Sequence, residues 1–184
     1  MYFMLPKKNV YLFKYWFVGV LLSIPISTIL YYSIWLFNKK PPMVNRPRES
    51  NLLLYRIDLM IITPYLETWI MAGFVVAIIK IFKQLYKNDT SSDIPYIAKI
   101  TIAFLCAVMA LFAHFRYEDW GVHAAWLFFI YSMLFIKIRS RASINTAVVL
   151  VALVHAFNNL LCIPMEVFET RYFIPVMLNA QHGI

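Results

Sequence analysis

The sequence of 184 residues predicts an all-α protein, a polytopic bundle of five to six transmembrane helices. Hydrophobic residues make up 62% of the chain and charged residues only 14%. The mean hydropathy is +0.68, and the apolar residues form long uninterrupted blocks. This composition excludes a soluble enzyme, a disordered chain and a secreted disulfide scaffold. The length predicts a single integral membrane domain over residues 1–184.

Each predicted span is an apolar block long enough to cross the hydrocarbon core, which needs about 20 residues. The first, residues 15–37, contains no charge, and we expect it to be retained because no signal-peptide cleavage site follows it. The second, residues 57–79, carries Asp58 and Glu67 and is closed by two lysines. The third covers residues 97–115 and is followed by a short polar segment.

The C-terminal third of the chain predicts two more spans. Residues 120–136 form the fourth, preceded by a predicted loop with Glu118 and Asp119. Residues 142–163 form the fifth, which we expect to end at Pro164 because proline interrupts helical hydrogen bonding. A last apolar segment, residues 172–178, is too short to span the membrane and accounts for the uncertain sixth helix.

The net charge of +8 predicts contact with lipid headgroups and not with nucleic acid, because Lys and Arg cluster at the ends of the apolar blocks. An orientation with the N-terminus in the cytoplasm places 10 of these basic residues inside and 7 outside, a small difference. Cys106 and Cys162 lie in apolar stretches without metal-ligand spacing, which predicts two small buried side chains. The aromatic residues are expected mostly at the lipid and the membrane interface.

Four polar residues within or beside the spans are candidates for function: Glu67, His114, His155 and Asn159. An ionisable side chain at the centre of a membrane helix costs about 2.5–3.5 kcal/mol on insertion scales, so it requires an explanation. Asn159 follows His155 by four residues on the same helix face, and Asn158 is nearly as well placed. Each residue alone also fits a structural role, such as a protonated Glu or a helix-capping His. Together, from three helices, they can hold a divalent metal or activate a water molecule.

Other chemistries lack their sequence signals. The chain has no glycine-rich phosphate loop, no His-Glu-x-x-His motif and no serine in a glycine-flanked elbow. His123, at the start of the fourth span, is expected at the membrane interface.

The spacing resembles that of the CPBP family of intramembrane proteases, which comprises CAAX proteases and bacteriocin-processing enzymes and is also called Abi. The family pattern is Glu-Glu-x-x-x-Arg, then Phe-x-x-x-His, then His-x-x-x-Asn, each on its own helix. The third motif matches at His155 and Asn159, and the second keeps His114 but has Ala110 in place of Phe. The first motif keeps Glu67, with Thr68 and Ala72 where the family has Glu and Arg. The motif-bearing core covers about residues 57–163.

The resemblance implies hydrolysis of a peptide bond in a membrane-associated peptide or protein. Composition gives the expected localisation, a bacterial cytoplasmic membrane. By it, Glu67 and His114 position and activate water, while His155 and Asn159 bind a metal or stabilise the oxyanion. The set Glu67, His114 and His155 suits Zn²⁺, and a metal-free glutamate mechanism stays open beside it. Because Thr68 departs from the motif, a catalytically impaired CPBP-like scaffold or bacteriocin-immunity-type protein is the alternative. A haem carrier with the two histidines as axial ligands is a third hypothesis, which leaves Glu67 unexplained.

Overall fold

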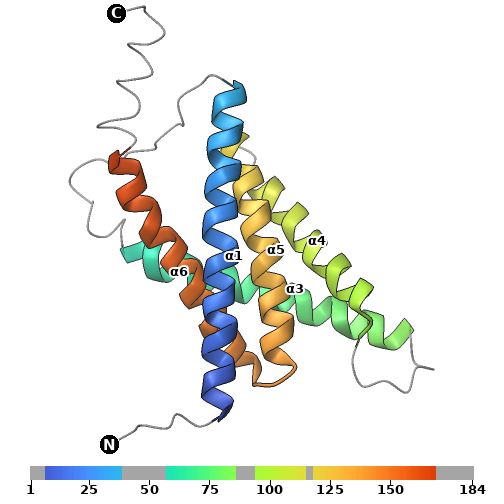
Figure 1. Ribbon diagram of the computed structural model, residues 1–184. Helices are drawn as coiled ribbons and strands as arrows, with labels where there is room; N and C mark the ends of the chain where they lie inside the picture. The colour runs from blue at the N-terminus through green and yellow to red at the C-terminus, as the bar shows by residue number, and fades with distance from the viewer. Residues whose placement is uncertain (1–6, 39–56, 86–93, 115–117, 169–184) are drawn as a thin grey trace, which may run out of the picture.

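The computed structural model describes residues 7–38, 57–85, 94–114 and 118–168 (Figure 1). Its elements, in chain order, are α1 (Lys7–Asn38), the π-helical turn η2 (Asp58–Ile62), α3 (Thr63–Leu85), α4 (Tyr96–Ala113), α5 (Glu118–Arg139) and α6 (Ile144–Phe168). Within these ranges, five helices are long and apolar enough to cross a membrane: Val10–Leu30, Met60–Gln84, Tyr96–Ala113, Gly121–Arg139 and Ile144–Leu161. The predicted all-α bundle of membrane-spanning helices is confirmed, and the chain is an integral membrane protein. The segment 172–178 lies outside the described residues.

Two predicted helix boundaries were wrong. Glu118 and Asp119, expected in a loop, are the first residues of α5. Acidic residues favour a helix N-terminus because they interact with the positive end of the helix dipole. Pro164 does not end α6, which continues to Phe168. A proline removes a single backbone donor, and membrane helices tolerate it where neighbouring groups satisfy the freed carbonyl.

Helix α5 is the central element of the bundle and packs against α1, α3, α4 and α6 (Figure 1). Its side chains Tyr131, Phe135 and Ile138 are fully buried. Gly19 lets α1 approach closely, because a Cβ atom there would lie 2.7 Å from Leu134 Cδ2. Such glycine contacts are typical of membrane helices, whose association depends on van der Waals packing.

The N-terminal end of α1 lies beside the turn between α5 and α6. The guanidinium of Arg141 lies 5.2 Å from the ring centroid of Tyr11 and 5.7 Å from that of Tyr15. These distances allow cation–π attraction. Directly after the turn, Ser143 caps α6, since the Thr146 N–H donates to Ser143 Oγ at 3.2 Å. The start of α6 is therefore fixed by a local hydrogen bond. This end of the bundle is basic and aromatic, a composition that suits the headgroup layer of a membrane.

A π-helical turn precedes α3 and sets the position of its first residues. The Thr63 N–H donates to the Asp58 carbonyl, five residues earlier, and the buried Pro64 has no N–H to donate. The regular four-residue bonding pattern is therefore interrupted just before Glu67. π-Helical turns inside helices frequently accompany functional sites.

Candidate active site

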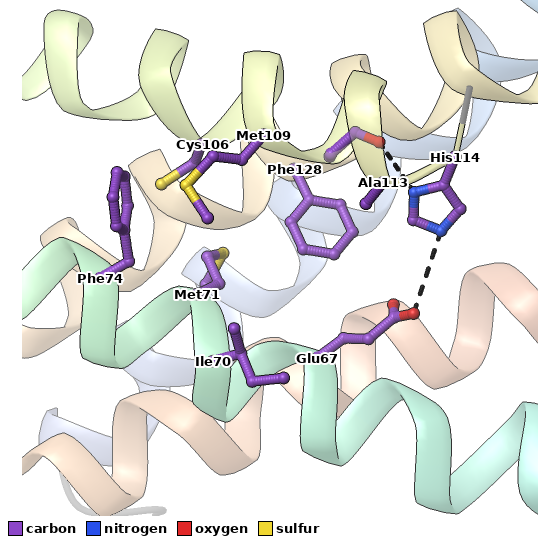
Figure 2. A pocket seen from close by; sticks show the side chains of 10 residues that line it. Glu67, Ile70, Met71, Phe74, Cys106, Met109, Ala113, His114 and Phe128 are labelled. Carbon is purple, nitrogen blue, oxygen red and sulfur yellow. Dashed lines mark hydrogen bonds and ion pairs between the residues drawn. The ribbon is translucent and has the colours of Figure 1, made fainter.

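The carboxylate of Glu67 faces two imidazoles that come from two other helices. Glu67 Oε1 lies 4.0 Å from His114 Nε2, and Glu67 Oε2 lies 3.6 Å from His155 Nε2. The side chains of Glu67 and His114 are 28% and 24% exposed, whereas that of His155 is 7% exposed. Three of the four residues singled out in the sequence therefore meet, although they are far apart along the chain. Figure 2 shows Glu67 and His114 pointing toward each other.

The orientation of His114 is fixed by the end of α4. Its ring Nδ1 lies 2.9 Å from the Ala110 carbonyl oxygen, and its backbone N–H donates to the same oxygen at 3.0 Å (Figure 2). A carbonyl can only accept, so Nδ1 carries the proton in this contact. Nε2 is left facing Glu67, as an acceptor in the neutral ring and as a donor in the imidazolium.

Two aromatic rings of α5 hold His155. The Tyr131 and Phe128 ring centroids lie 4.9 and 5.8 Å from that of the imidazole, and Phe128 also lies 6.3 Å from the His114 ring. The sequence analysis missed both residues, because it assigned the aromatic side chains mostly to lipid. Their spacing of three residues, which places them on one helix face, was the available signal.

A buried polar network joins α1, α5 and α6 next to the site. The Asn158 Nδ2 group donates to Ser23 Oγ at 3.1 Å and to the Tyr131 hydroxyl. All three residues are at most 5% exposed. Asn158 therefore connects helices, while Asn159, 8% exposed, lies one turn beyond His155 on α6. No sequence pattern singled out Ser23.

His123, expected at the membrane interface, is buried between helices near the start of its span, and its depth in the membrane stays a prediction. It is 5% exposed on α5 and interacts electrostatically with His155. Gly121 explains this position, because a Cβ atom there would lie 3.3 Å from the Leu111 carbonyl oxygen. The start of α5 is thus held tightly against the end of α4. This contact also supports the turn that carries His114.

The two positions where the first motif departs from the family pattern face the interior. Thr68 and Ala72 are each 1% exposed on α3. In the described part of the chain, Thr68 Oγ1 has no hydrogen-bond partner. A buried Glu and Arg would need partners for their charges there, whereas Thr and Ala fill the same positions without a charge. The bundle is therefore locally consistent with its altered motif.

An apolar pocket of about 160 Å³ begins at the Glu67–His114 pair. It lies between α3 and α4, with Phe128 of α5 at one wall (Figure 2). Three sulfur-containing side chains, Met71, Cys106 and Met109, line it further along. The polar groups at one end and the apolar walls form the arrangement typical of a small-molecule or side-chain binding site.

The donor types of Glu67, His114 and His155 suit zinc. In the described ranges, no group of three or more His, Cys, Asp or Glu side chains has the placement needed to hold a metal ion. Among the described residues, the buried Nδ1 of His155 has no hydrogen-bond partner, whereas a ligating histidine normally donates its second N–H. The zinc site stays a prediction, and the mechanism below is derived without a metal.

No protein-family model, curated protein or solved structure matches this chain. The resemblance to the CPBP family therefore stays a prediction from the motifs around Glu67, His114 and His155.

Proposed function

We propose that the protein is a CPBP-like intramembrane endopeptidase that hydrolyses a peptide bond of a membrane-associated peptide or protein. The observation that carries this proposal is the Glu67 carboxylate between two imidazoles, at the mouth of an apolar pocket. Glu67 and His155 lie inside apolar spans, and His114 directly follows one. The basic helix ends support contact with anionic lipid.

The distances from Glu67 to the two histidines suit a bridging water. The two O–N distances, 3.6 and 4.0 Å, exceed the usual hydrogen-bond range of about 2.7–3.2 Å. A water molecule can bridge polar groups at such separations. The proposed mechanism uses an ionised Glu67 and a neutral His114, which both accept, so the water would donate one hydrogen to each. Its oxygen lone pairs then stay available for attack on a carbonyl carbon.

In the proposed reaction the water oxygen bonds to the carbonyl carbon of the substrate, and its proton passes to the Glu67 carboxylate. The C–N bond of the tetrahedral intermediate then breaks. The proton on Glu67 moves to the leaving nitrogen, which gives an amine end and a carboxyl end. N–H groups of His155 and Asn159 would stabilise the oxyanion, as preorganised donors do in acyl transfer.

The test compares wild type with Glu67→Gln, reconstituted in vesicles of phosphatidylethanolamine and phosphatidylglycerol. The probes are synthetic apolar peptides of about 20 residues, long enough to span the bilayer. Mass spectrometry in H₂¹⁸O identifies products by the labelled carboxyl end. We expect Glu67→Gln to slow cleavage by about 10²–10⁴-fold, the usual contribution of a general base. Asp58→Asn is the matched control, because Asp58 is an exposed acid of the same chain.

The main alternative is a scaffold that binds a membrane partner without hydrolysis. The uncharged, buried Thr68 and Ala72 favour this alternative. Absence of cleavage of the whole peptide set by wild type would support the scaffold. Equal cleavage by wild type and Glu67→Gln would show that another group activates the water.

A further inference from the structure

We propose that the apolar pocket between α3 and α4 selects the substrate: it holds one large apolar side chain next to the bond that is hydrolysed. This inference rests on the proposed function and adds the class of substrate. The pocket and the polar cluster are continuous, since Glu67 and His114 line both. A side chain seated in the pocket therefore places its own backbone carbonyl beside the carboxylate.

The size of the pocket fits a single side chain. Its volume is about 160 Å³. A closed apolar cavity of about 150 Å³ holds one benzene molecule, so a phenyl ring or a branched aliphatic side chain fills this space. A folded helix is far too wide, at about 10–12 Å across. The substrate would therefore present an extended backbone at the site, with one side chain inserted.

The outer wall of the pocket faces the lipid. Ile70 and Met109, on the two helices that flank it, are 67% and 42% exposed, and both positions lie within membrane spans. A substrate segment can therefore reach the pocket sideways from the bilayer. An apolar, membrane-embedded peptide matches this access route, whereas a charged soluble peptide would lose its hydration on the way.

The sulfur-containing wall predicts tolerance among large apolar residues. Met71, Cys106 and Met109 provide polarisable, and in the methionines flexible, surfaces that adapt to different shapes. We expect Leu, Met and Phe to be accepted at the selected position. Gly leaves the pocket empty, and Asp places an unpaired charge against apolar walls.

The test uses the membrane peptides described above with Gly, Ala, Leu, Phe, Trp or Asp at the position before the cleaved bond. Wild type should cleave the Leu and Phe peptides about tenfold or more faster than the Gly peptide. Ala113→Leu narrows the pocket and should shift the preference toward Ala, while Met109→Ala widens it and should admit Trp. Ala107→Leu is the matched control, since Ala107 lies half-buried on the same helix and does not line the pocket.

Unchanged preferences in both pocket variants, with Glu67→Gln inactive, would overturn the pocket assignment and leave the proposed function intact. Cleavage by Glu67→Gln at the wild-type rate would instead contradict the proposed function.

A second readout needs no turnover: the Phe-type peptide carries a photoreactive phenylalanine and is cross-linked to Glu67→Gln. Adducts on pocket residues of α3 and α4 that unlabelled peptide suppresses support the assignment. Adducts on residues outside the pocket would overturn the assignment. Adducts that phospholipid acyl chains suppress and unlabelled peptide does not would overturn it as well.

Discussion

Replacing Tyr131 by Phe removes one hydroxyl from the buried network and keeps the ring that packs on His155. The hydroxyl accepts from Asn158 Nδ2, and Tyr131 is 1% exposed. Interhelical hydrogen bonds in membrane proteins contribute about 0.6 kcal/mol on average and at most about 1.7 kcal/mol. Because the Asn158 N–H would remain buried without this acceptor, we expect the upper part of that range. The free energy of unfolding should fall by about 1–1.7 kcal/mol.

The same position separates stability from catalysis. Tyr131→Phe retains the ring 4.9 Å from the His155 imidazole, so cleavage should stay within about twofold of wild type. Tyr131→Leu removes the ring as well, and a less constrained His155 should lower kcat by about tenfold or more. Both variants lose the hydroxyl, so only the loss of the ring distinguishes their activities.

Unfolding is followed by tryptophan fluorescence during a detergent titration, and cleavage by the vesicle assay. Tyr96→Phe serves as the control, because Tyr96 is 69% exposed and should change stability by less than about 0.5 kcal/mol. A Tyr131→Phe variant as stable as Tyr96→Phe would refute the network as a source of stability. Equal loss of cleavage in the Phe and Leu variants would refute the role assigned to the ring.

Three further predictions concern packing and the metal. Gly121→Val should displace the end of α4 with His114 and reduce cleavage about tenfold or more. Gly73→Val should not, because among the described residues no atom outside its own stretch of helix lies within 4 Å of a Cβ there. Equal rates for the two variants would contradict this reasoning. Phe135→Ala, at a fully buried site of α5, should lower the free energy of unfolding by about 3–5 kcal/mol. Phe104→Ala, where the side chain is 60% exposed, should lower it by far less. Similar losses in the two variants would show that α5 is not the packing centre. Cleavage should persist in a metal chelator, and its loss, with restoration by Zn²⁺, would establish the zinc mechanism instead.

The number and position of the spans could be predicted because lipid leaves the backbone few choices. A chain that crosses the hydrocarbon core must satisfy its own backbone hydrogen bonds, so a long apolar block becomes a helix. The boundaries were less predictable. The polarity of Glu118 predicts a loop, yet this residue begins α5. Pro164 predicts the end of a helix, yet α6 continues to Phe168. Polarity and proline mark local preferences, which neighbouring helices and the lipid can override.

The ionisable members of the candidate site were recognisable because such side chains are costly in lipid. Glu67, His114 and His155 each stood out against apolar surroundings, and they meet. Their supporting residues gave no comparable signal. Tyr131 and Ser23 are neutral side chains of kinds that are common in membrane helices, and only the packing of α1 and α5 against α6 assigns them a role.

The two sides of the candidate site differ in how tightly they are packed, and this difference suits the proposed hydrolysis in a membrane. His155 lies on the tightly packed side, held by Tyr131 and by the network that joins three helices. Glu67 and His114 lie on the open side of the site. There the contact between α3 and α4 is less extensive than the contact between α5 and α4. A fixed imidazole keeps the geometry needed for charge stabilisation, because misplacement by about 1 Å can cost about 10²-fold in rate. A partly exposed carboxylate, by contrast, can be reached by both water and substrate. In the proposed function, water and substrate therefore reach the site through the loosely packed α3–α4 contact, and the buried network holds the catalytic side chains in place.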